Sequence, residues 1–167
     1  MRRLHVVRHA KSSWDDPTLA DHDRPLARRG VSAARRLRAW LQESDVRPDL
    51  VVCSSALRAR ATLDLVLPAL GSPEIVVDDS LFQASGEGML ARLRTLGPDV
   101  EEALLVGHEP GLSELVLLLT ADGGTLRARV AEKFPTGALA TLEGGGEWEV
   151  LEPGSMHLVA LVLPREL

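Results

Sequence analysis

The sequence predicts an α/β protein, a three-layer α/β/α sandwich whose mostly parallel central sheet gains antiparallel strands towards the C-terminus. Through the first two thirds of the chain, short apolar runs alternate with longer segments of helical spacing. The final third changes to strand-like segments separated by turns rich in Gly and Pro. A length of 167 residues suits one hydrophobic core. We therefore expect a single domain over residues 1–167.

Four short apolar segments predict the parallel strands. Residues 4–7 form a largely apolar run without alternation, which is typical of a strand covered on both faces. The same pattern predicts further strands at 50–53, 75–77 and 103–106. Each of these is followed by a segment long enough to cross over the sheet, so a parallel arrangement is expected.

Helices are predicted between these strands. Segment 25–43 has apolar residues close to helical spacing and arginines for its solvent face, and further helices are expected at 56–67, 89–96 and 110–119. Ser55 is the predicted N-cap of the second helix, and Asp122-Gly123-Gly124 is expected to end the last one.

The final third is predicted to add antiparallel strands. The strand-like segments are 137–142, 147–151 and 157–163, and they are separated by Gly144-Gly145-Gly146 and Pro153-Gly154.

Composition excludes several classes of function. A net charge of −5 argues against a general nucleic-acid binder. Cys53 is the only cysteine, so an internal disulfide and a thiolate metal cluster are excluded, and an inert core thiol is expected. No apolar run approaches the roughly 20 residues that span a bilayer, and the N-terminus lacks the features of a secretory signal. These observations predict a cytoplasmic protein without membrane partners.

The residues that follow the predicted strands carry the candidate chemistry. In open α/β sheets, ligands bind beyond the carboxyl ends of the strands. Two histidines and two arginines occur at such positions and are expected to converge on one edge: His9, His108, Arg8 and Arg58.

These segments resemble those of the histidine phosphatase superfamily, also called phosphoglycerate mutase-like, whose signature is Arg-His-Gly or Arg-His-Ala after the first strand. The closer resemblance is to the SixA-like phosphohistidine phosphatase branch. It rests on Val7-Arg8-His9-Ala10, Lys11-Ser12-Ser13-Trp14, Asp21-His22-Asp23-Arg24-Pro25-Leu26, Arg29-Gly30, Ser54-Ser55-Ala56-Leu57-Arg58-Ala59, Val106-Gly107-His108-Glu109-Pro110-Gly111 and Pro164-Arg165. The pattern covers essentially the whole chain, in order.

The resemblance implies a phosphatase that works without metal or other cofactor, with His9 as the nucleophile. A neutral imidazole can attack phosphorus and form a phosphohistidine intermediate. Arg8 and Arg58 would hold the nonbridging phosphoryl oxygens, and His108 would add a further hydrogen-bond donor. Neighbouring cations should disfavour protonation of His9 near neutral pH.

One departure from the family bears on the substrate. Phosphomonoesterases of the superfamily place a Glu after the third strand to protonate the leaving alkoxide, whereas this sequence has Gln83 there, with Asp79 and Glu87 as the nearest candidate acids. Imidazole leaves easily without such help, or is already protonated, because the pKa of its conjugate acid is only about 6.5. Phosphohistidine in a protein, such as a phosphotransfer domain, is therefore the favoured substrate. A small-molecule phosphomonoesterase with Asp79 or Glu87 as acid and a non-catalytic phosphate-binding module are the alternatives.

The remaining polar residues have secondary roles in this interpretation. Lys11 and Ser12 are candidates for the pocket mouth, and Asp23 with Arg24 is expected to pin the loop. Asp21-His22-Asp23 is interpreted as a solvated cluster rather than a metal site. An arginine cluster on the first helix can steer an acidic partner or simply form a solvated face, and both readings stay open: Arg28, Arg29, Arg35, Arg36 and Arg38.

Overall fold

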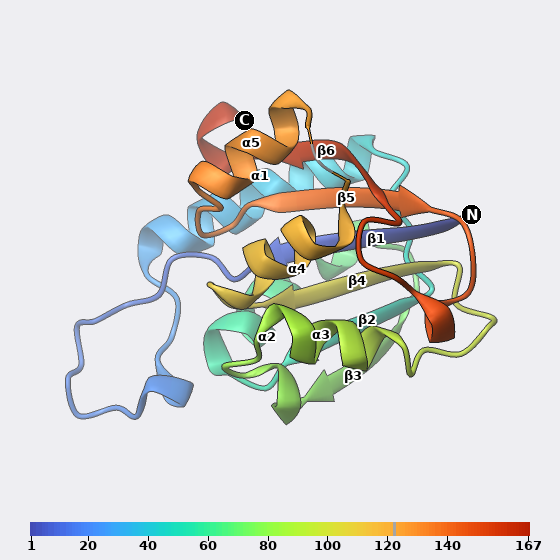
Figure 1. Ribbon diagram of the computed structural model, residues 1–167. Helices are drawn as coiled ribbons and strands as arrows, with labels where there is room; N and C mark the ends of the chain where they lie inside the picture. The colour runs from blue at the N-terminus through green and yellow to red at the C-terminus, as the bar shows by residue number, and fades with distance from the viewer. Residues whose placement is uncertain (122) are drawn as a thin grey trace.

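The computed structural model, described here for residues 1–121 and 123–167, is built around one six-stranded mixed sheet (Figure 1). Its strand order is β3-β2-β4-β1-β5-β6. The strands are β1 (Arg2–Arg8), β2 (Leu50–Ser54), β3 (Glu74–Asp78), β4 (Glu102–Gly107), β5 (Leu139–Gly144) and β6 (His157–Val162). The helices are α1 (Arg28–Glu43), α2 (Leu57–Val66), α3 (Gly86–Leu93), α4 (Gly111–Leu119) and α5 (Thr125–Glu132).

The sheet has the predicted mixture of strand directions. β1, β2, β3 and β4 are mutually parallel where they pair, whereas β5 is antiparallel to both β1 and β6. The predicted α/β class with antiparallel additions late in the chain is therefore confirmed.

Helices cover both faces of the sheet, as predicted. α1 and α2 pack over one face, where Leu37, Leu41 and Leu63 meet Val7, Val51 and Val106. α3, α4 and α5 pack over the other face, where buried side chains of those helices meet inward residues of β1, β2 and β4. Alternate residues of one strand serve opposite faces, since successive side chains of a strand point to opposite sides.

Two local expectations were wrong, and one helix was missed. Segment 147–151 contains a short 3₁₀ helix, Trp148–Val150, in place of a strand; the buried indole of Trp148 donates its Nε1–H to the Val100 carbonyl oxygen at 2.6 Å. Helix α5 was not anticipated, because it buries only Val130 and shows little periodicity. α2 begins after Ala56 without a side-chain cap, and the Ser55 hydroxyl instead contacts His22 Nε2 at 2.9 Å.

Cys53 lies in the core, where burial raises the pKa of its thiol to about 12, as suits an inert thiol.

α4 ends at Leu119, and Asp122, which was expected to help end it, lies outside the described residues. None of the helices in the described ranges combines the length and apolar character that crossing a bilayer requires.

Candidate active site

A pocket of about 240 Å³ opens at the carboxyl ends of the central parallel strands. Register pairs Arg8 of β1 with Gly107 of β4, and Cys53 of β2 with Val106 of β4, so the residues that follow these strands emerge side by side. The pocket is lined by Arg8, His9, Lys11, Ser12, Trp14, Arg24, Arg58, His108, Glu109 and Thr136.

His9 is held in one tautomer. Its Nδ1 lies 2.7 Å from the carbonyl oxygen of Ala10, and a carbonyl oxygen only accepts hydrogen bonds, so Nδ1 carries the proton. The lone pair is then on Nε2. Burial lowers the pKa of His9 to about 3, and the nearby His108, Arg58 and Arg8 act in the same direction against the Ala10 contact. His9 is therefore a neutral imidazole with an unprotonated Nε2 across the physiological pH range.

His108 faces His9, with ring centroids 5.1 Å apart. Its Nε2 lies 2.7 Å from the hydroxyl oxygen of Ser54, at the end of β2, while its Nδ1 is buried and has no partner within the described part of the chain. Burial lowers the pKa of His108 to about 4, with Arg58 and Arg8 adding to the effect and Asp21 opposing it. The imidazole of His108 is thus neutral; its Nε2 is hydrogen-bonded to Ser54, and its Nδ1 can bind a ligand.

The two arginines approach the pocket from different elements. Arg58 lies in the first turn of α2 and donates from Nη1 to the Asp21 carbonyl at 2.7 Å and from Nη2 to the Asp21 carboxylate at 3.1 Å. Arg8, at the end of β1, donates from Nη1 to the Phe134 carbonyl at 3.1 Å. Burial lowers the pKa of the Arg8 guanidinium, an effect that Glu109 opposes. In both arginines Nε is buried without a partner among the described residues.

Backbone contacts fix the segment that carries His9. The Ala10 N–H donates to the Thr62 hydroxyl at 2.9 Å, and that hydroxyl donates to the Arg58 carbonyl at 2.8 Å, which ties the segment to α2. On the other side, the Gly137 N–H donates to the carbonyl oxygens of Arg8 and His9 at 3.0 and 3.1 Å. The position of His9 is thus set from two separate elements.

Arg24 organises the loop between β1 and α1, which extends away from the body beyond the strand ends (Figure 1). Its guanidinium donates to the Asp21 carboxylate at 3.1 Å and to the Ser12 hydroxyl at 2.9 Å, and it stacks 3.5 Å from the centre of the exposed Trp14 ring. Of the two residues expected to pin the loop, Arg24 thus makes these contacts, while Asp23 contacts its neighbour His22 at 3.4 Å. Asp21, which also binds Arg58, links the loop to the pocket.

The structure gathers most of the predicted site residues and leaves two outside. The pocket lining includes Arg8, His9, Arg58 and His108, together with Lys11 and Ser12. Asp79 and Glu87 do not line it, and both are exposed near the starts of a 3₁₀ helix and of α3. No group of three or more His, Cys, Asp or Glu side chains in residues 1–121 and 123–167 is arranged to hold a metal ion.

Sequence reasoning missed two polar contacts. Glu109, the one carboxylate lining the pocket in the described structure, accepts from the backbone N–H and the hydroxyl of Ser113, both at 2.7 Å. The Ser54 contact with His108 joins residues 54 positions apart. Both residues lie within the segments that carried the resemblance, but their partners depend on tertiary packing.

Comparisons with known proteins agree with this geometry. A model of the histidine phosphatase superfamily (branch 1) matches residues 4–85. An uncharacterized protein of Mycobacterium tuberculosis is 39% identical over 162 residues, covering 95% of this chain and 100% of that protein. A relative from Mycobacterium leprae, also uncharacterized, is 37% identical over 164 residues, covering 95% of this chain and 100% of its own length.

Solved structures are also similar. A structure assigned as the phosphohistidine phosphatase SixA of Nakamurella multipartitia has a TM-score of 0.86 and 29% identity, covering 98% of this chain and 96% of its own. The protein histidine phosphatase SixA complexed with tungstate has a TM-score of 0.80 and 26% identity, with 98% of both chains covered. An Escherichia coli structure assigned as an α-ribazole-5'-P phosphatase shares the fold, with a TM-score of 0.71 and 19% identity over 98% of each chain.

Proposed function

Because this chain belongs to the histidine phosphatase superfamily, we propose that it removes phosphate from phosphohistidine in a protein, without metal, through a phosphoryl group carried on His9. Phosphatase activity itself is supported by the family and by the similar SixA structures. We further propose the substrate, the covalent route and the roles of the individual residues.

One observation carries the proposal: a neutral imidazole lies among hydrogen-bond donors that have no acceptor. Buried polar groups in proteins are nearly always hydrogen-bonded, so exceptions call for a reason. Three unpartnered buried nitrogens in the described structure belong to residues lining the pocket, namely Arg8 Nε, Arg58 Nε and His108 Nδ1. An anionic phosphoryl group would supply the missing negative charge beside the His9 lone pair.

In the first step, the lone pair of His9 Nε2 forms a bond to phosphorus. The other ring nitrogen of the substrate first takes a proton from solvent. The bond between phosphorus and the substrate imidazole nitrogen then breaks, and that nitrogen keeps the electron pair, so the leaving group is a neutral imidazole. In the second step, water attacks the phosphorus, the bond to His9 Nε2 breaks, and inorganic phosphate is released with His9 neutral again. The Nδ1–H bond to Ala10 keeps the same tautomer through both steps.

Arg8 and Arg58 are proposed to stabilise the phosphoryl oxygens as charge redistributes in the transition state. Arg58 is oriented for this by Asp21, and Arg8 by the Phe134 carbonyl. His108 would donate from Nδ1, the nitrogen without a protein partner, if the Ser54 hydroxyl donates to its Nε2. Ser54 is therefore proposed as a positioning residue that selects the tautomer of His108.

The leaving group supports phosphohistidine over a phosphomonoester. Glu109, the carboxylate at the pocket in the described structure, uses both oxygens to accept hydrogen bonds from Ser113. It is therefore poorly suited to give a proton to an alkoxide. Imidazole needs no such strong acid, since its conjugate acid has an ordinary pKa of about 6.5.

A substrate panel tests the proposal. We expect release of phosphate from a phosphohistidine protein and from free phosphohistidine, undiminished by a chelator, with much slower turnover of sugar phosphates and nucleotides. His9→Ala should reduce turnover at least about 1,000-fold, in the range seen when a nucleophile is removed. His157→Ala, an exposed histidine on β6, is the matched control and should retain wild-type activity.

Trapping the intermediate completes the test. Brief reaction with labelled substrate should leave a label on the wild-type chain that acid removes and base does not, and His9→Ala should stay unlabelled. Preferred turnover of phosphomonoesters would overturn the substrate assignment. Full activity in His9→Ala would overturn the covalent route, and phosphate binding without any turnover would favour a binding module.

A further inference from the structure

A second hollow of about 350 Å³ lies along α1, next to the catalytic pocket. It is called the basic groove here and is lined by Lys11, Arg29, Ala33, Arg36, Pro135, Thr136, Pro164 and Arg165. Lys11 and Thr136 also line the catalytic pocket. The basic groove therefore adjoins the site where a phosphoryl group would react.

The basic groove concentrates positive charge in an acidic protein. The chain carries a net charge of −5, yet four cationic side chains and no carboxylate line this groove. Lys11, Arg29, Arg36 and Arg165 are exposed, and none forms an ion pair within residues 1–121 and 123–167. Among the described residues, the Arg36 guanidinium donates a hydrogen bond to the neutral Ser32 hydroxyl alone, at 3.2 Å. The arginines of the described structure that pair with carboxylates are buried or half-buried, for example Arg129 with Glu166.

The spacing of these cations favours an extended ligand over a compact one. Arg29 and Arg36 are two helical turns apart on one face of α1, a rise of about 10 Å along the helix axis. A single phosphate or carboxylate cannot span this separation. Several carboxylates distributed along a chain segment can, while that segment runs from the groove towards the catalytic pocket.

We infer that the basic groove binds an acidic segment of the protein substrate, next to its phosphohistidine, and so selects among phosphohistidine proteins. This inference rests on the proposed function. Lys11 sits at the junction, so the acidic segment would begin close to the phosphoryl group and continue past Arg29 and Arg36 towards Arg165. Attraction between opposite charges would act mainly on association and would weaken as salt screens it.

Three synthetic phosphohistidine peptides of equal length test the inference. One carries Glu at the positions flanking phosphohistidine on one side, one carries Gln and one carries Lys; free phosphohistidine is the fourth probe. At low salt we expect kcat/KM for the Glu peptide to exceed that for the Gln peptide about tenfold, with the Lys peptide lower still. The preference should largely disappear in 0.5 M NaCl, where the Debye length is only about 4 Å.

Charge reversal in the groove supplies the matched variants. Arg29→Glu and Arg36→Glu should each remove most of the preference for the Glu peptide while leaving turnover of free phosphohistidine unchanged, which also shows that the variants fold. Arg35→Glu makes the same change of charge at an exposed position of α1 that does not line the groove. It should keep most of the preference.

The outcomes separate the two proposals. Absence of turnover with every phosphohistidine probe would overturn the proposed function, and the groove assignment with it. Turnover with equal kcat/KM for the Glu and Gln peptides would overturn the groove assignment alone. An equal loss in Arg35→Glu and Arg29→Glu would also overturn it, since the effect would then come from overall charge.

Discussion

At the scale of single residues, the backbone around His9 decides which nitrogen can react. The Ala10 carbonyl accepts from Nδ1–H, and burial keeps the ring uncharged. An imidazole with an ordinary pKa near 6.5 would be mostly protonated, and so not nucleophilic, at pH 5.5. In this protein the lone pair on Nε2 persists well into the acidic range.

Titration of the His9 imidazole by NMR in phosphate-free buffer checks this directly. Its folded-state pKa of about 3 lies below the ordinary 6.5, so we expect the neutral Nδ1–H tautomer from pH 7.5 down to at least pH 4.5. The same difference lowers the stability of the fold as pH falls from about 6.5 towards 3, since only the unfolded chain binds the proton there. N-acetylhistidine in the same buffer is the reference. Half-protonation of folded His9 near pH 6.5 would contradict the expectation.

At the scale of elements, α1 packs closely against the loop after β1 at Gly30. A Cβ atom at position 30 would lie 2.1 Å from the Lys11 carbonyl oxygen, and that oxygen already accepts the N–H of Ala27 at 2.8 Å. A side chain there would push α1 away from the segment that follows His9. The absence of a side chain at residue 30 therefore allows the helix to border both the pocket and the basic groove.

Gly30→Ala should accordingly lower the free energy of unfolding by about 3 kcal/mol, because overpacking against backbone outweighs the gain of roughly 1 kcal/mol in helix propensity. Urea denaturation measures the loss, and activity should fall with the displaced loop. Gly97→Ala is the matched control, since no atom lies within 4 Å of its added Cβ. Wild-type stability in Gly30→Ala would contradict this, because α1 would then shift away from Lys11 with no loss in the free energy of unfolding.

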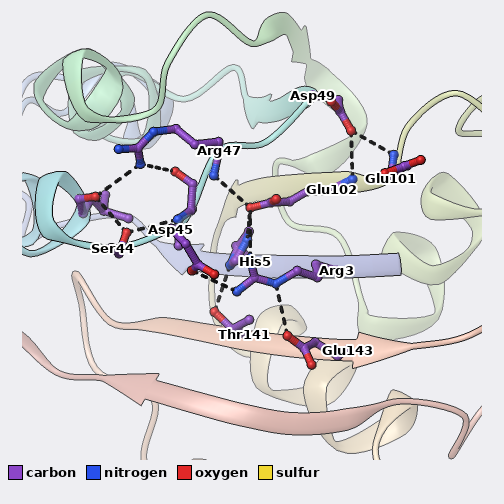
Figure 2. Close-up of polar contacts among 12 residues, drawn as sticks. Arg3, His5, Ser44, Asp45, Arg47, Asp49, Glu101, Glu102, Thr141 and Glu143 are labelled. Carbon is purple, nitrogen blue, oxygen red and sulfur yellow. Dashed lines mark hydrogen bonds and ion pairs between the residues drawn. The ribbon is translucent and has the colours of Figure 1, made fainter. Parts of the chain in front are cut away.

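At the scale of the whole molecule, the two ends of the sheet differ in the polar groups they hold. The pocket lies at the carboxyl ends of β1, β2 and β4, while a polar cluster lies towards their amino ends (Figure 2). There His5, fully buried in β1, contacts the Thr141 hydroxyl of β5 at 2.8 Å and the Glu102 carboxylate of β4 at 2.7 Å. The same carboxylate accepts the Arg47 N–H at 2.9 Å. The cluster joins three strands and the segment that leads into β2.

Glu102→Ala is expected to lower stability without changing the chemistry. Burial opposes ionisation of Glu102, but hydrogen bonds from His5 and the Arg47 N–H hold the pKa of the carboxyl below its usual value, so its contribution is present at neutral pH and lost in acid. Removing it leaves buried His5 short of a partner, at a cost of about 2 kcal/mol. Chemical denaturation should show the loss, while turnover at low temperature matches wild type. A large fall in turnover would mean that the two ends are coupled.

Much of the fold was predictable because its signals are local. Apolar runs, helical spacing and turn residues reflect neighbours in sequence, and they predicted four parallel strands and four of the helices close to their observed bounds. The failures at Trp148 and α5 occur where tertiary burial of one or a few side chains outweighs local pattern. In the same way, the order of motifs along the chain was enough to nominate Arg8, His9, Arg58 and His108.

The sequence by itself thus determined the α/β class, the residues that meet at the strand ends and their chemical type. Only the tertiary structure decided the tautomer of His9, the contact of Ser54 with His108, the pairing of Arg24 with Asp21, and the exclusion of Asp79 and Glu87 from the pocket lining. It also decided that some arginines of α1 border a groove next to the pocket. The physical reason is that strand ends follow from local periodicity, whereas hydrogen-bond partners and pocket walls depend on how loops distant in sequence pack together.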